Sequence, residues 1–77
     1  MNKKRRERIR YAAGLLEQAS SIVDNCRDEE SDAMSNLEGT SLENTDRYSE
    51  MEDACDYLDN AYEEIESARD KLFSAIG

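Results

Sequence analysis

The sequence predicts an all-α protein in which two long antiparallel helices form an alanine-rich coiled-coil hairpin. The 77 residues include no proline, three glycines and 38% charged side chains, a composition typical of long helices. Large apolar residues and alanines recur every seven residues in both halves of the chain, which is the repeat of a coiled coil. A short polar segment with one glycine, EGTSLENTD, separates the two halves.

The first helix is expected over about residues 3–37. Each large residue at heptad position a is followed three residues later by a small residue at position d. Position a holds Ile9, Leu16, Val23, Glu30 and Leu37, and position d holds Ala12, Ala19, Cys26 and Ala33. Glu30 interrupts the apolar series, and we expect its stem to lie along the seam while its carboxylate reaches water.

The turn is expected over residues 38–44. Gly39 can end the first helix in the left-handed conformation. Two start signals for the second helix remain open: Thr40 with Glu43 as a capping box, or Thr45 followed by Asp46.

The second helix is expected over about residues 45–76 and completes a single domain of residues 1–77. Position a holds Met51, Leu58, Ile65 and Leu72, and position d holds Ala54, Ala61, Ala68 and Ala75. If the chain folds back about residue 42, each apolar layer pairs one large residue with one small residue. The alanines then allow the helix axes to approach to about 8 Å.

Further apolar residues flank this seam. They either widen the seam of a lone hairpin or form an interface between hairpins. A two-helix chain of this length has no other means to bury them, so we expect dimerisation into a four-helix bundle. The expected interface residues are Leu15, Ile22, Tyr57, Tyr62, Phe73 and Ile76.

Charge is distributed unevenly: the net charge is −9, with +5 on residues 1–10 and −14 on residues 11–77. One explanation is that the basic segment neutralises Glu63, Glu66 and Asp70 near the end of the second helix. The other is a site for a nucleotide or another phosphorylated small molecule, because the acidic remainder would repel duplex DNA. The candidate anion-binding residues are Lys3, Lys4, Arg5, Arg6, Arg8, Arg10 and Tyr11.

The acidic side chains of the second half also have two explanations. They form either the solvated face of a helix or an interaction face that imitates nucleic acid and binds a basic cleft of another protein. The candidate residues are Asp53, Asp56, Asp59, Glu63, Glu64 and Glu66.

Several function classes lack their usual residues. There is no histidine, no glycine-rich phosphate loop and no Cys-x-x-Cys spacing, so we expect no enzyme activity, metal site or cofactor. Cys26 and Cys55 are expected to be small buried apolar residues, and whether they can form a disulfide is open. No apolar run suits a signal peptide or a membrane span, so we expect a cytoplasmic protein.

An arginine-acid-acid stretch, a turn and an acidic heptad helix follow one another in the segment RDEESDAMSNLEGTSLENTDRYSEMEDACDYLDNAYEEIESA. With this order, most of the chain resembles short acidic proteins encoded by phages and mobile elements of Gram-positive bacteria. The turn lacks the proline of the family pattern. The resemblance implies a protein that binds and blocks a host component, such as a protein of bacterial defence. A purely structural or assembly role is the third expectation, beside inhibition of a host protein and sequestration of a phosphorylated ligand.

Overall fold

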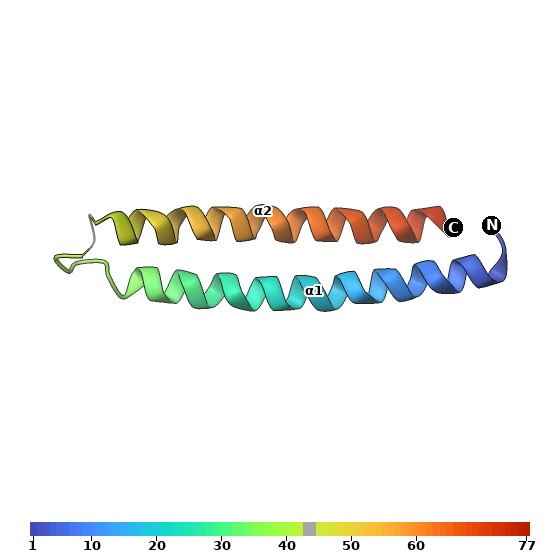
Figure 1. Cartoon of the computed structure of the whole chain (residues 1–77), viewed down its shortest axis with the longest axis horizontal. Helices are drawn as coiled ribbons and strands as arrows, with labels where there is room; N and C mark the ends of the chain where they lie inside the picture. Colours follow the sequence, from blue (N-terminus) through green and yellow to red (C-terminus); the bar gives the residue numbers. More distant parts are fainter. Residues whose placement is uncertain (43–44) are drawn as a thin grey trace.

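The chain forms a long helical hairpin. The computed structural model describes residues 1–42 and 45–77, and within them it contains two helices, α1 (Lys3–Ser35) and α2 (Asp46–Ala75). The helices lie side by side and antiparallel, with the loop at one end and both chain termini at the other (Figure 1). The hairpin measures 60 × 14 × 13 Å along its principal axes. The predicted all-α hairpin is therefore confirmed.

Local hydrogen bonds define both ends of α1. The backbone N–H of Arg5 donates to the Asn2 side-chain oxygen at 2.8 Å, so Asn2 satisfies one of the donors that the first turn leaves free. At the other end the backbone tightens, because the N–H of Leu37 bonds to the carbonyl of Met34 at 3.0 Å. This three-residue spacing ends α1 at Ser35 rather than at residue 37.

A left-handed glycine and a threonine cap shape the turn between the helices. Gly39 has a φ of 77°, which favours glycine. The Thr45 hydroxyl accepts a hydrogen bond from the Tyr48 N–H at 3.4 Å and donates to the Leu42 carbonyl at 2.8 Å. Thr45 is thus the N-cap of α2, the second of the two predicted start signals. The alternative capping box depends on Glu43, which lies outside the described residues.

The predicted large residues line the seam between the helices. All of them are half-buried, namely Ile9, Leu16 and Val23 of α1, Leu37 just after α1, and Met51, Leu58, Ile65 and Leu72 of α2. The most buried side chains are small: Ala13 is fully buried and Ser20 is 4% exposed. The Ser20 hydroxyl donates to the Glu17 carbonyl at 3.0 Å, so its burial leaves no unpaired donor.

The position of Cys26 corrects one prediction. Cys26 is exposed, whereas the heptad pattern placed it in the seam as a buried residue. The row of α1 that faces α2 is Ala13, Ser20 and Arg27. Each of these residues follows by one the residue that the heptad pattern predicts there, namely Ala12, Ala19 and Cys26. Consecutive helical residues point about 100° apart, so the inward turn of Arg27, which reaches Asp59 of α2, turns Cys26 outward.

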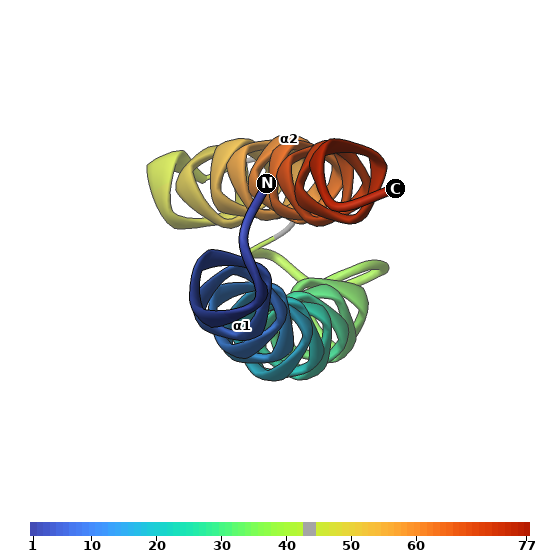
Figure 2. The same ribbon diagram turned by 90° about the vertical axis from the view of Figure 1, so that its right-hand side faces the viewer.

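The two helices cross instead of running exactly alongside one another, as the end-on view shows (Figure 2). Antiparallel heptad helices commonly pack with a small crossing angle of about 20°. The radius of gyration is 17.5 Å, against about 11.5 Å for a compact domain of this length. A single seam between two helices therefore supplies the whole interior of the described chain.

Candidate functional site

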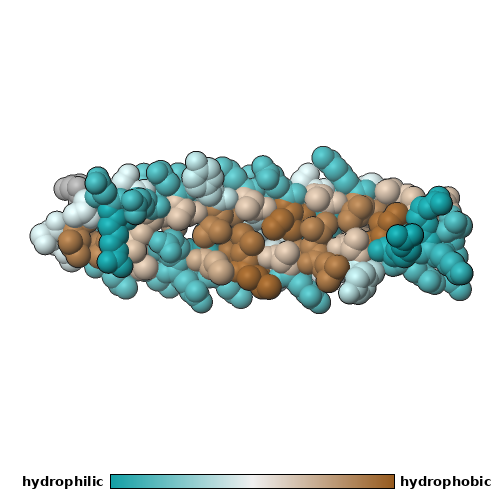
Figure 3. Space-filling view, in the orientation of Figure 1, coloured by the Kyte–Doolittle hydropathy of each residue, from teal (hydrophilic) through white to brown (hydrophobic). Residues whose placement is uncertain are grey.

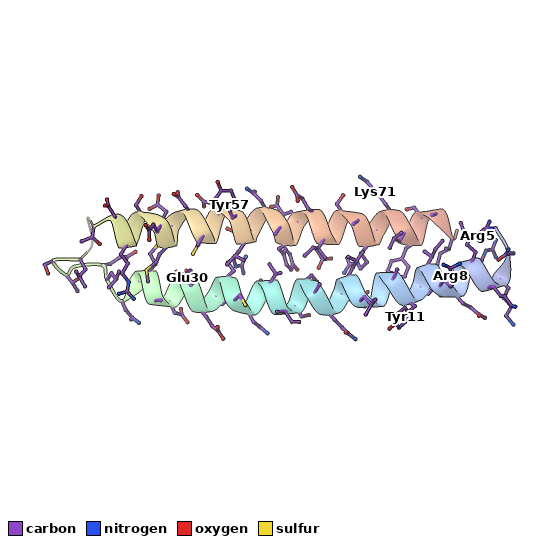
Figure 4. The ribbon with its side chains drawn as sticks, in the orientation of Figure 1. Arg5, Arg8, Tyr11, Glu30, Tyr57 and Lys71 are labelled. Atoms are coloured by element: carbon purple, nitrogen blue, oxygen red, sulfur yellow. The ribbon has the colours of Figure 1, made fainter. Side chains whose placement is uncertain are left out.

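The basic arm, which we define as residues 1–10, projects from the hairpin. It is helical from Lys3 onward, and residues 1–8 are all exposed. The first turns of α1 extend past the C-terminal end of α2 (Figure 1). Arg5 lies beyond that end and Arg8 lies close to it, while Tyr11 points away from α2 (Figure 4). The arm is thus a helical surface with water on most of its circumference.

None of the six basic side chains of the arm is in an ion pair within the described part of the chain. The arm therefore makes no ion pair with Glu63, Glu66 or Asp70 in the described residues. Glu66 and Asp70 instead pair with Arg69, and Glu63 is exposed. The cations also sit at the positive end of the helix dipole, with no acidic residue in the first turn, so they oppose the dipole of α1.

A shallow, open hollow lies on one side of the arm. Lys4, Glu7, Arg8 and Tyr11 line it, four residues that helical spacing brings onto one face of α1. Tyr11 is 71% exposed. The combination of two cations and an exposed ring can hold a phosphate and stack on a planar group, although Glu7 places one negative charge in the same hollow.

The acidic face, defined as the six predicted carboxylates of α2, divides into two sets. Asp53, Asp56, Glu63 and Glu64 are exposed and have no ion pair or hydrogen bond among the described residues. Asp59 and Glu66 are instead half-buried and bound by arginines. Four of the six predicted residues are therefore open to a partner.

Arg27 joins the two helices through a cluster of carboxylates. Its guanidinium donates to Asp59 of α2 at 2.9 Å and to Asp24 and Asp28 of α1 at 2.7 and 3.1 Å. Hydrogen bonds to Asp59 and Asp28 raise the pKa of Arg27 above its usual range. The cluster fixes the register of the hairpin midway along its length.

A second arginine performs a local role on α2. Arg69 pairs with Glu66 and, at 3.1 Å, with Asp70, and the hydrogen bond to Asp70 is the main cause of its raised pKa. The negative charge of Glu66, followed by burial, raises the pKa of Tyr62. Sequence analysis missed both arginine clusters, although acids three residues before Arg27 and Arg69 are a signal for helical ion pairs.

An apolar surface lies on the side of the hairpin away from Arg27's carboxylates. Asp24 and Asp59 share one side because Arg27 binds both, and helical spacing puts the alanine rows on the other side. We call this surface the alanine face. It consists of Ala12, Leu15, Ala19, Ile22, Cys26 and Ala33 of α1 with Ala54, Tyr57, Ala61, Ala68 and Ala75 of α2. Apolar atoms of both helices form one band on this face (Figure 3).

The predicted interface residues separate into three groups. Leu15, Ile22 and Tyr57 are 47%, 63% and 75% exposed and lie on the alanine face. Tyr62 and Ile76 are half-buried. Phe73 is 42% exposed, and its seven-residue spacing from Glu66 places it on the charged side instead.

Both cysteines are free thiols. Cys55 is half-buried, and burial, followed by the charge of Glu30, raises its pKa. Glu30 is half-buried and lies between the helices (Figure 4), at the seam position that the heptad pattern predicts.

Residues 1–42 and 45–77 contain neither a cluster of metal ligands nor a membrane-spanning helix. No group of three or more cysteine or acidic side chains is placed to hold a metal ion there. Neither α1 nor α2 has a stretch of the length and apolarity that crossing a membrane requires.

Comparison with known proteins does not assign the chain to a family. No family model, curated protein or solved structure matches it.

Proposed function

We propose that this chain is a non-enzymatic binding protein whose acidic face docks on a basic surface of another protein. The observation that carries the proposal is the row of four exposed carboxylates on α2, Asp53, Asp56, Glu63 and Glu64, which have no ion pair with another described residue. Their spacing of three, seven and one residues keeps them on the outer part of one rigid helix. A rigid row of charge needs little ordering when it binds a complementary surface.

Electrostatics favours a basic protein as the partner. Residues 11–77 carry a net charge of −14, which attracts cationic surfaces and accelerates encounter at low salt. The resemblance to phage proteins favours a host protein, which the chain would block by occupying its basic cleft.

The test is a comparison of two variants with equal changes of charge. Asp56→Lys with Glu63→Lys alters the acidic face by four charges. Gln18→Lys, Asn25→Lys and Asp32→Lys make the same change on exposed positions of α1. The tagged proteins are used to capture partners from an extract of the natural host cell, and the captured protein is then purified and titrated.

We expect the α2 variant to bind that partner at least about tenfold more weakly, because charge pairs at an interface commonly contribute more than 1.4 kcal/mol. The α1 variant should bind nearly as the unchanged chain does. Equal weakening by both variants would show only a general charge effect and would exclude the acidic face as the site.

A second candidate function is sequestration of a phosphorylated small molecule by the basic arm. The observation that favours it is the absence of ion pairs at all six cations within the described chain. Cations that oppose their own helix dipole lower stability unless an anion binds them, and a phosphate would relieve that cost.

Calorimetric titration with ATP and with pyrophosphate tests this candidate. Replacement of Arg5, Arg6, Arg8 and Arg10 by alanine should abolish binding, whereas Arg47→Ala with Lys71→Ala, which removes exposed cations of α2, should leave it unchanged. No binding by the unchanged chain, or retained binding after loss of the four arginines, would eliminate this function.

A further inference from the structure

The hairpin exposes more surface than a folded chain of its mass normally does. Its accessible surface is 5708 Å² at 8.8 kDa. A monomeric protein of that mass exposes about 4,800 Å². The excess of about 900 Å² matches the area that each partner of a standard protein interface buries, about 800 Å².

The alanine face contributes exposed apolar side chains to this surface. Leu15, Ile22 and Tyr57 stand exposed at its rims, and the alanine rows lie between them in one band over both helices (Figure 3). Contiguous apolar patches of this kind usually mark an interface on soluble proteins.

We infer that a second copy of this chain covers the alanine face, with the two hairpins stacked face to face and reversed end to end. The result is a four-helix bundle in which each copy contributes the same surface. Alanine rows allow the helices of the two copies to approach to about 8 Å, so that Leu15, Ile22 and Tyr57 reach the facing hairpin.

Charge selects the reversed orientation. Residues 1–10 carry +5, while residues 28–53 around the loop carry ten acids against one base, a net charge of −9. If the two copies ran in the same direction, the two basic arms would lie together and repel one another. Reversal places each basic arm near the acidic loop end of the other copy, where opposite charges attract.

The reversed arrangement has one twofold axis perpendicular to the helices. It stacks α1 on α1 of the other copy near the middle of the hairpin, where Ile22 lies. In such an isologous interface each residue near the axis meets its own copy. A substitution at Ile22 therefore changes the interface twice.

Sedimentation equilibrium at low salt tests the interface. The unchanged chain should have twice the 8.8 kDa mass at micromolar concentration. Ile22→Lys, at a side chain that is 63% exposed in the hairpin, should keep its helical circular dichroism but raise the dimer Kd at least about a hundredfold, because two charges enter the apolar contact. Phe73→Lys, on the charged side, should dimerise normally.

Disulfide trapping tests the orientation, in chains with Cys26→Ala and Cys55→Ala. Ile22→Cys should cross-link to its own copy, whereas Leu15→Cys should not, since seven residues on each chain add about 21 Å along the axis. A monomer at 100 µM, a normal dimer of Ile22→Lys, or equal cross-linking at both positions would overturn the inference. The inference does not depend on the proposed acidic-face binding: Asp53, Asp56 and Glu63 lie on other rows of α2, and only Glu64, seven residues from Tyr57, borders this interface.

Discussion

At the scale of single residues, Arg27 makes the polar link between the helices. Its guanidinium bonds to Asp59 across the seam and to two acids of its own helix. Removal of Arg27 leaves these carboxylates close together without a cation, so like-charge repulsion replaces attraction. The hairpin is therefore expected to depend on this residue more than on any surface charge that lacks a partner in the other helix.

Arg27→Ala should lower the Tm by on the order of 3 °C at low salt, because exposed ion pairs contribute modestly. Asp28→Ala, which removes only a contact within α1, should change the Tm less. Thermal unfolding followed by circular dichroism measures both. The difference should shrink in 1 M salt, which screens exposed charges, and a difference that persists there would contradict the ionic explanation.

The two thiols should react at different rates. Cys26 is exposed, whereas Cys55 is half-buried and its pKa is raised by burial and by Glu30. A raised pKa leaves less thiolate at any given pH below it, and thiolate is the reactive species. At pH 8 and low protein concentration, iodoacetamide should modify Cys26 first, as peptide mass spectrometry would show.

The same reaction reports on the alanine face. Cys26 lies on that face, so its alkylation should slow as the protein concentration rises and the second copy covers it. Alkylation of Cys26 at a rate independent of concentration would contradict the covering of this face.

At the scale of elements, the loop depends on a backbone conformation. Gly39 has a φ of 77°, and open space surrounds the position of an added Cβ. Gly39→Ala should nevertheless lower the free energy of unfolding by about 1 kcal/mol, because an L-residue is strained in the left-handed region. Urea unfolding measures the change, and an unaltered midpoint would show that the loop relaxes to another conformation.

Glu30 interrupts the apolar series of α1 at the seam. Glu30→Leu would add a large apolar side chain where Glu30 is half-buried, and should stabilise the hairpin by about 1 kcal/mol. It should also lower the pKa of Cys55, since the charge of Glu30 is one cause that raises it. Urea unfolding and the pH dependence of Cys55 alkylation test the two effects; a less stable variant would contradict the placement of Glu30 at the seam.

The helices and their large seam residues could be predicted from the sequence because heptad periodicity is a local pattern. The rotation of α1 that turns Cys26 outward could not. Ala12 and Ala13 are both small, as are Ala19 and Ser20, so composition does not distinguish which of each pair faces α2. The choice depends on Arg27 and its partner in the other helix, which no local pattern contains.

The charged sites were predictable only in part, for the same reason. Sequence located the basic arm and the acidic residues, but not which carboxylates were already bound. Asp59 and Glu66 differ from Asp56 and Glu63 only in the direction they face relative to the seam. That direction follows from the helix packing. Asp59 and Glu66 are therefore bound by arginines, whereas Asp56 and Glu63 are exposed.

At the scale of the whole molecule, the hairpin resembles half of a four-helix bundle. Among residues 1–42 and 45–77, Ala13 and Ser20 alone are fully or nearly fully buried in the seam. Small domains with so little interior need additional means of stabilisation. A second copy on the alanine face would supply an interior, while Asp53, Asp56 and Glu63 of each copy would remain on the outside for a basic partner. Assembly and binding would then use different surfaces of the same helices.

Small-angle X-ray scattering at about 100 µM tests the face-to-face pairing most directly, because one curve gives both the mass and the length. We expect twice the mass of 8.8 kDa with a length still near the 60 Å of one hairpin, and a wider cross-section. A particle of 8.8 kDa, or a doubled mass with a length near twice 60 Å, would contradict the stacking of two hairpins through the alanine face.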